Sequence, residues 1–108
     1  MSARERQLAS ARVLVTLLSE DLPDVSSWYF YAGKEVNGQL DHNLSVEERW
    51  AVLHAWAAYL GSEITTIRYE KRTGGSAGVV AWIEGVRVYV WAAFPKKDLP
   101  KLGGESDG

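Results

Sequence analysis

The stretch GVVAWIEGVRVYVWAAF, which spans residues 78–94, decides the fold. Glu84-Gly85 in its middle is a tight-turn signal, and the β-branched and aromatic residues on both sides favour strands. In the second half, aliphatic residues occupy every other position, namely Val86, Val88, Val90 and Ala92. Because successive side chains of a strand point to opposite faces, the last strand, 86–94, has one aliphatic face and one face of Arg87, Tyr89 and Trp91.

Upstream of this hairpin, the sequence predicts another strand and, before it, a helix. Residues 63–71 alternate in polarity, and the glycine-rich turn at 73–76 joins them to the strand at 78–83. The helix is predicted over 46–60, with Ser45 as its N-cap and Glu48 at the spacing of a capping box. Gly61 suits the left-handed residue that ends a helix.

The first helix is predicted over residues 3–21 and ends before Pro23. Its apolar residues recur at a spacing of three and four, which places them on one side of the helix: Leu8, Ala11, Val15, Leu18 and Leu22. We expect this stripe to pack against the sheet. Val13 and Leu17 lie outside the stripe, and we expect either the sheet or something else, such as a partner, to cover that side of the helix. Arginines near the N-terminal end and Glu20-Asp21 at the C-terminal end are the reverse of what the helix dipole favours.

Residues 25–36 are predicted to form the first strand, because the aromatic run 28–31 suits a strand that is apolar on both faces. Asn37-Gly38 is a turn signal that could fold residues 39–41 back as a short return strand. The order α-β-(β)-α-β-β-β predicts an α+β fold in which two helices pack on one face of a four- to five-stranded antiparallel sheet. Residues 1–95 are expected to form this single domain, and residues 96–108 a disordered tail.

The composition is that of one globular domain without disulfides. The chain has 108 residues, of which 46% are hydrophobic and 24% are charged. It has no cysteine, which excludes disulfides, thiolate metal sites and cysteine nucleophiles and favours a reducing compartment. We see no signal-peptide pattern and no stretch of about 20 apolar residues. A cytoplasmic protein without membrane contact is therefore expected.

The charge is unevenly distributed, although the formal net charge is only -2. Residues 20–63 carry eight acidic residues against two basic ones, and residues 64–101 carry seven basic residues against three acidic ones. Such an asymmetry can steer a charged partner toward the molecule. It is also typical of a bipolar surface that is simply solvated.

No catalytic residue and no metal site are expected. A zinc site needs three or four ligands, and the two histidines, His42 and His54, show no metal-binding spacing. His42 suits a turn, and His54 suits a packing position on the second helix. The glycines at 73–76 lack the GK[ST] ending of a phosphate loop. We therefore expect neither a cofactor nor a small-molecule substrate, and no enzymatic activity.

The aromatic content of five Trp, five Tyr and two Phe exceeds what one small core readily buries. We expect the surplus on the sheet face that points away from the helices. Trp, Tyr and Arg are the usual anchors of protein interfaces. The main hypothesis is a non-catalytic protein-interaction or regulatory module that self-associates as a homodimer. Its expected partner-binding residues are Trp82, Arg87, Tyr89, Trp91, Val13 and Leu17.

Two alternatives stay open at this stage. The aromatic face could stack the bases of single-stranded nucleic acid, with phosphates contacting Arg68, Lys71, Arg72 and Arg87. The C-terminal segment could also fold over this face and bury it. Finally, the frequency of Ala, Arg, Val and Trp is typical of a high-GC genome and suggests a small protein of an actinobacterium, a phage or a mobile element.

Overall fold

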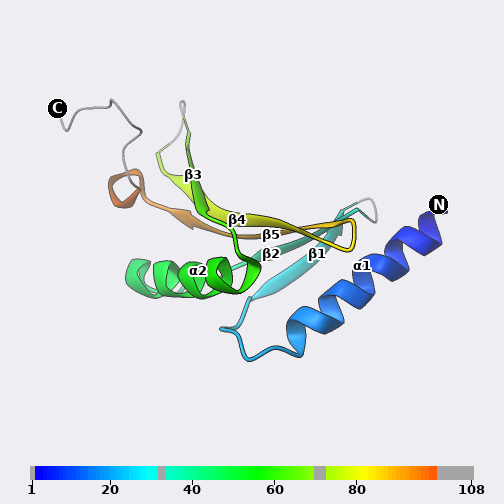
Figure 1. Ribbon diagram of the computed structural model, residues 1–108. Coiled ribbons are helices and arrows are strands. Elements are labelled where there is room, and N and C mark those ends of the chain that lie inside the picture. Colours follow the sequence, from blue (N-terminus) through cyan, green and yellow to red (C-terminus); the bar gives the residue numbers. More distant parts are fainter. Residues whose placement is uncertain (1, 32–33, 70–72, 100–108) are drawn as a thin grey trace.

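The structure is a computed structural model that describes residues 2–31, 34–69 and 73–99. Two helices lie on one side of a five-stranded sheet (Figure 1). The elements follow the order α1 (Ala3–Leu18), β1 (Ser27–Tyr31), β2 (Glu35–Gln39), α2 (Val46–Leu60), β3 (Ile64–Arg68), β4 (Gly75–Ile83) and β5 (Val86–Phe94). A short 3-10 helix, η1 (Lys96–Asp98), follows. The α+β class and the two-layer arrangement predicted from the sequence are confirmed.

The sheet is mixed rather than fully antiparallel. Its strand order is β1-β2-β5-β4-β3, and β2 pairs with β5 in parallel, with Val36 opposite Val88. The other three pairings are antiparallel. The chain leaves β2 through α2 and returns by way of β3 and β4, so that β5 enters the centre of the sheet beside β2. Local alternation along each strand carries no information on this long-range pairing.

Asn37 and Gly38 lie in the middle of β2, and the predicted turn at this pair is wrong. Gly38 has a packing role instead. A Cβ atom at this position would lie 2.7 Å from the ring of Trp28 and 2.9 Å from Val25. Glycine at position 38 therefore allows these side chains to approach the backbone closely. In place of the single strand predicted over 25–36, the structure has two strands, β1 and β2.

The helix α1 packs against β2 and β5 with the face opposite to the predicted one. Its buried residues are Ser10, Val13 and Leu17. Val15 and Leu18, which were expected in the core, are each 63% exposed. Both sides of this helix carry apolar residues at helical spacing, and the small buried side chain of Ser10 accompanies the less obvious stripe. The predicted partner-binding role of Val13 and Leu17 is therefore wrong, because both side chains belong to the core.

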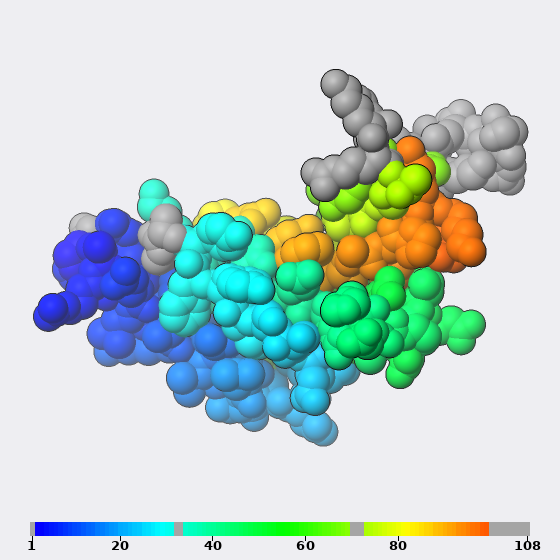
Figure 2. Space-filling view, turned by 180° about the vertical axis from the view of Figure 1, so that it is seen from behind, coloured from blue at the N-terminus to red at the C-terminus, as the bar shows by residue number. Residues whose placement is uncertain are grey.

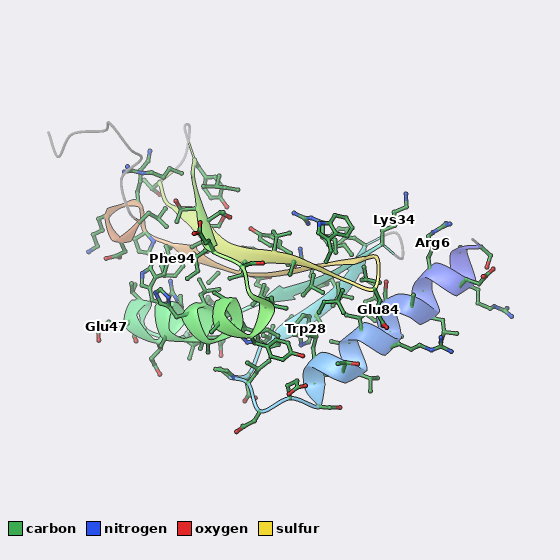
Figure 3. The ribbon with its side chains drawn as sticks, viewed as in Figure 1. Arg6, Trp28, Lys34, Glu47, Glu84 and Phe94 are labelled. Atoms are coloured by element: carbon green, nitrogen blue, oxygen red, sulfur yellow. The ribbon has the colours of Figure 1, made fainter. Side chains whose placement is uncertain are left out.

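The helix α2 has the predicted bounds and ends. Ser45 and Glu48 form the capping box, and Gly61 adopts the left-handed conformation at the C-terminal end. Leu53 and Trp56 are its buried residues. Trp28 lies between the two helices in Figure 3. Its ring meets the Trp56 ring edge-on, with 5.7 Å between the two ring centres. An equivalent capping box, Ser2 with Glu5, begins α1 and was not predicted.

The end of the domain differs from the prediction. The hairpin turn at Glu84-Gly85 is confirmed, and both residues have positive φ angles, as a tight I′ turn requires. The segment Lys96–Asp98, which was expected in a disordered tail, forms η1, and Leu99 after it lies in the core at 5% exposure. The domain thus extends past Pro95, because the Leu99 side chain packs on Gly75. Residues 100–108 of the predicted tail lie outside the described residues.

Candidate binding face of the sheet

Within the part of the chain that the structure describes, both helices pack on one face of the sheet, and we call the other face the open face. Both helices pack against the opposite face, where Val36, Val88 and Val90 are fully buried. Figure 2 views the molecule from behind and shows α1 in blue at one end and α2 in green toward the other. The strand register places these residues on the open face: Tyr29, Tyr31, Glu35, Asn37, Gln39, Thr65, Ile67, Tyr69, Ser76, Gly78, Val80, Trp82, Arg87, Tyr89 and Trp91.

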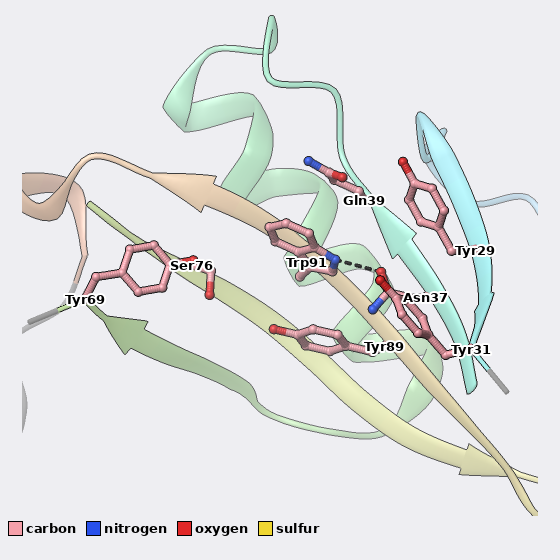
Figure 4. Close-up of a pocket in the computed structure, with 8 residues that line it drawn as sticks. All are labelled: Tyr29, Tyr31, Asn37, Gln39, Tyr69, Ser76, Tyr89 and Trp91. Carbon is pink, nitrogen blue, oxygen red and sulfur yellow. Dashed lines mark hydrogen bonds between the residues drawn. The ribbon is translucent and has the colours of Figure 1, made fainter. Parts of the chain in front are cut away.

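The open face is hollowed at its centre. A shallow pocket of about 540 Å³ is formed over the middle of the sheet, and Figure 4 shows the side chains that line it. Four strands, β1, β2, β4 and β5, and the residue that follows β3 contribute to its lining, which consists of aromatic rings and neutral polar groups: Tyr29, Tyr31, Asn37, Gln39, Tyr69, Ser76, Tyr89 and Trp91. None of these eight side chains carries a formal charge at neutral pH.

Two aromatic rings on β5 form a fixed platform in this hollow. The indole nitrogen of Trp91 donates a hydrogen bond of 2.8 Å to the side-chain oxygen of Asn37 on β2. The rings of Tyr89 and Trp91 are stacked, with an angle of 12° between their planes and 6.4 Å between their centres. Beneath them lies Gly78, where a Cβ atom would come within 2.6 Å of the Tyr89 ring. The glycine therefore makes the space that the platform occupies.

Arg87 lies at one end of the platform and is already paired. It forms a salt bridge with Glu35 on β2, and its guanidinium group lies over the Tyr89 ring, 5.3 Å from the ring centre. Trp82 is opposite Arg87 in the β4–β5 register and is 66% exposed. The structure thus places four predicted residues of the sheet on one face, namely Trp82, Arg87, Tyr89 and Trp91. The positive charge of Arg87 is balanced by the Glu35 carboxylate.

Tyr89 retains its proton across the neutral range. Burial raises the pKa of its hydroxyl above the ordinary value, because desolvation penalises the phenolate. The hydrogen bond with Ser76 and the charge of Arg87 oppose this rise in pKa without cancelling it. A neutral phenol can both donate and accept a hydrogen bond. Tyr89 therefore offers the hollow a polar group without a charge.

Of the four residues expected to contact phosphates, the two that the structure describes lie on opposite faces of the sheet. Arg68 lies on the helix side of β3 and is opposite Gly75, whereas Arg87 is opposite Trp82 at the other end of β4. Lys71 and Arg72 lie outside the described residues. Arg87 is the one member of this set that the structure places on the open face, and Glu35 balances its charge.

The histidines lie away from the open face. His42 is in the loop before α2, and its carbonyl oxygen accepts a hydrogen bond of 2.9 Å from Arg49. His54 is exposed on α2 beside Trp50 and lines a second pocket of about 530 Å³ between α2, β3 and η1. Across residues 2–31, 34–69 and 73–99, the structure shows no group of three or more potential metal ligands. No helix within these ranges has the length and apolar character needed to cross a membrane.

The part of the site that comes from β2 was not predicted from the sequence. Asn37 and Gln39 line the hollow, but the expected turn at 37–38 concealed this strand. Of the two aromatic pairs in the first strand that could have joined this face, Trp28 with Phe30 or Tyr29 with Tyr31, the second pair lines the hollow. A usable signal was present in the chain. Val36, Gly38 and Leu40 alternate with Asn37 and Gln39, which is the pattern of a strand with one buried face and one polar face.

A scan against protein-family models and searches of curated proteins and of solved structures gave no match.

Proposed function

We propose that this chain is a non-catalytic interaction module whose open face binds a protein. The observation that carries the proposal is the Tyr89–Trp91 platform, which lies in an uncovered hollow and is fixed by the Trp91–Asn37 hydrogen bond. Rigid aromatic side chains bind with little loss of conformational entropy and are the most frequent anchors of protein interfaces. An exposed face of this type on a small domain is typical of a site of interaction.

The chemistry of the hollow indicates the kind of protein segment that would bind. Its rings offer apolar surfaces, and the Asn37 and Gln39 amides with the tyrosine hydroxyls can bond to peptide groups. Because the lining is uncharged, an uncharged segment with apolar or aromatic side chains fits it best. A convex segment of another protein suits the hollow better than a second copy of the same face. Two hollow faces brought together would leave an unfilled space between them.

The experiment that tests this proposal is a selection of peptide ligands from a random displayed library, followed by affinity measurements. Trp91→Ala and Tyr89→Ala should each weaken the selected peptides at least tenfold, because they remove the platform. Tyr59→Ala removes an exposed tyrosine from α2, on the other side of the sheet, and should leave affinity unchanged. Equal effects of all three substitutions, or no enrichment of peptides, would contradict the proposal.

A titration with single-stranded DNA and RNA at low and moderate salt tests the nucleic-acid alternative. Binding through phosphate contacts weakens steeply as the salt concentration rises, because counterions are released. Binding of a neutral peptide to aromatic rings should change little over the same range. Oligonucleotide binding that falls with salt and is lost in Arg87→Gln would replace the protein-binding proposal with the alternative.

A further inference from the structure

The outer side of α1 carries a second apolar stripe, which is uncovered. Leu8, Val15 and Leu18 are 49%, 63% and 63% exposed, and Ala11 lies between them on the same side of the helix. Their numbers follow the alternating steps of three and four that form the contact line of paired helices. The buried residues Ser10, Val13 and Leu17 lie on the other side of α1. The helix is therefore apolar on two sides, and the domain covers one of them.

The charges at the two ends of α1 oppose its own dipole. Arg4, Arg6 and Arg12 stand against Glu5 in the first three turns, whereas Glu20 and Asp21 follow the last turn. The N-terminal end of a helix is the positive end of its dipole, so basic residues there and acidic residues at the other end are unfavourable. A second helix that runs in the opposite direction would bring each of these ends beside one of opposite charge and opposite dipole.

We propose that two copies of this chain pair through the outer stripe of α1, with the helices antiparallel and related by a two-fold axis. Leu8 of one copy lies against Leu18 of the second copy, and Ala11 lies against Val15 of the second copy. Arg4 then lies beside the acidic turn at 20–21 of the second copy. A parallel arrangement would place arginines beside arginines and carboxylates beside carboxylates, and it would align the two dipoles unfavourably.

This surface is distinct from the open face. The helix α1 lies on the opposite side of the sheet, packed on β2 and β5 by its other stripe. Pairing through the outer stripe therefore leaves the Tyr89–Trp91 platform of each copy uncovered. A helix of 16 residues is about 24 Å long. A contact of this length is smaller than a standard protein interface, so we expect a dimer that dissociates upon dilution.

The absence of cysteine from the chain allows a direct test of the orientation. We would prepare Leu8→Cys and Leu18→Cys as separate proteins and oxidise each of them alone and in an equimolar mixture. A disulfide requires Cα atoms within about 7 Å of one another. In the antiparallel pair, position 8 faces position 18 of the second copy, whereas equivalent positions are about 15 Å apart along the helix. The mixture should therefore give the mixed disulfide dimer, and each variant alone should stay monomeric on a non-reducing gel.

Each other outcome of this test overturns the proposal. Cross-linking of each variant alone, without the mixed product, would show a parallel pair. Equal cross-linking in all samples, and in a Thr16→Cys control on an exposed position outside the stripe, would show random collision. The absence of any cross-link would show that the stripe does not form an interface.

A second measurement uses the unmodified chain. Wild type should sediment as a concentration-dependent dimer at micromolar to submillimolar concentrations. Val15→Glu should shift the equilibrium at least tenfold toward monomer, because it places a charge in the centre of the stripe. Thr16→Glu adds the same charge at the neighbouring exposed position and should leave the dimer almost unchanged. A monomeric wild type, or equal behaviour of the two variants, would disprove the pairing. Trp91→Ala should not alter the dimer, which separates this result from the binding proposal.

Discussion

The indole ring of Trp91 turns back along β2 to Asn37 instead of toward Gln39, the residue directly opposite it in the parallel pair. The register pairs Gln39 with Trp91 and Asn37 with Tyr89, yet the 2.8 Å hydrogen bond joins Trp91 to Asn37. This diagonal contact orients the ring along the strand, where it stacks with Tyr89. The hydrogen bond thus fixes both rings of the platform.

Removal of this hydrogen bond should destabilise the domain modestly. We expect Trp91→Phe and Asn37→Ala each to lower the free energy of unfolding by about 0.5–1.5 kcal/mol, the usual contribution of one partly buried hydrogen bond. The double variant should cost little more than the worse single variant, because both substitutions break the same bond. Urea denaturation of the four proteins measures this coupling. Additive losses would mean that the bond contributes nothing of its own.

Adjacent leucines of α1 should respond differently to truncation. Leu17 is 1% exposed, so Leu17→Ala should lower the free energy of unfolding by about 2–5 kcal/mol. Leu18 is 63% exposed, so Leu18→Ala should change it by less than about 0.5 kcal/mol. Chemical denaturation at a concentration low enough for monomer compares the two variants. A larger loss for Leu18→Ala would restore the helix face that the sequence predicted.

These two leucines show why one part of the fold was predicted wrongly. Periodicity identifies a helix and its apolar stripes, but it does not say which of two stripes meets the sheet. The stripe with more apolar residues was predicted to face the sheet. The helix packs against β2 and β5 with the other stripe, which has fewer apolar residues. The helix α2 was predicted within its observed bounds because its ends carry local signals, the Ser45–Glu48 box and Gly61, that do not depend on the rest of the fold.

The capping box of α2 should contribute stability that is lost in acid. The backbone N–H of Ser45 donates a hydrogen bond to the Glu48 carboxylate. This bond, together with a hydrogen bond from the Ser45 side chain, lowers the pKa of the Glu48 carboxyl. A carboxyl whose pKa is lower in the folded state stabilises that state above its ordinary pKa. This contribution disappears as the pH falls through the lowered value. Stability should therefore decrease more steeply below about pH 4.5 in wild type than in Glu48→Gln.

Ser45→Ala should destabilise the domain at neutral pH by about 0.5–2 kcal/mol, because the backbone N–H of Glu48 loses the Ser45 hydroxyl as its acceptor. Thermal unfolding followed by circular dichroism over a pH series measures both effects. Glu47→Gln removes a charge from the same helical turn without touching the box and is the matched control. An identical acid response for Glu47→Gln and Glu48→Gln would assign the effect to general charge.

Gly78 should not tolerate even a methyl group. Its Cβ atom would lie 2.6 Å from the Tyr89 ring and 2.8 Å from the backbone oxygen of Val90. Because a backbone atom cannot move aside easily, we expect Gly78→Ala to cost about 1–3 kcal/mol. It should also change the near-ultraviolet circular dichroism of the platform. Ala93→Ser, a small change at an exposed residue of β5, is the control. A variant with wild-type stability and spectrum would show that the rings do not rest on this glycine.

The open face was predicted in outline, and its hollow was not. Alternation in β5 placed Arg87, Tyr89 and Trp91 on one face from local sequence alone. The contributions of β1 and β2 depended on a parallel pairing between residues 35–39 and 87–91, which no local pattern specifies. The Asn37-Gly38 sequence is also typical of a turn, and a glycine in a strand can instead mark a place where other side chains approach the backbone closely. The polar half of the site was therefore found only when the strands were placed side by side.

The position of β5 between β2 and β4 has a consequence for how the chain folds. Among the described strands, β5 comes last along the chain and is the central strand, so the middle of this sheet is synthesised after its other strands. Until residues 86–94 emerge, β2 has no neighbour on that side, and the valines that line the helix layer have little to pack on. Contacts between distant segments must then form together, which slows folding relative to a chain of local contacts. We therefore expect this domain to fold after its synthesis is nearly complete, in one cooperative step.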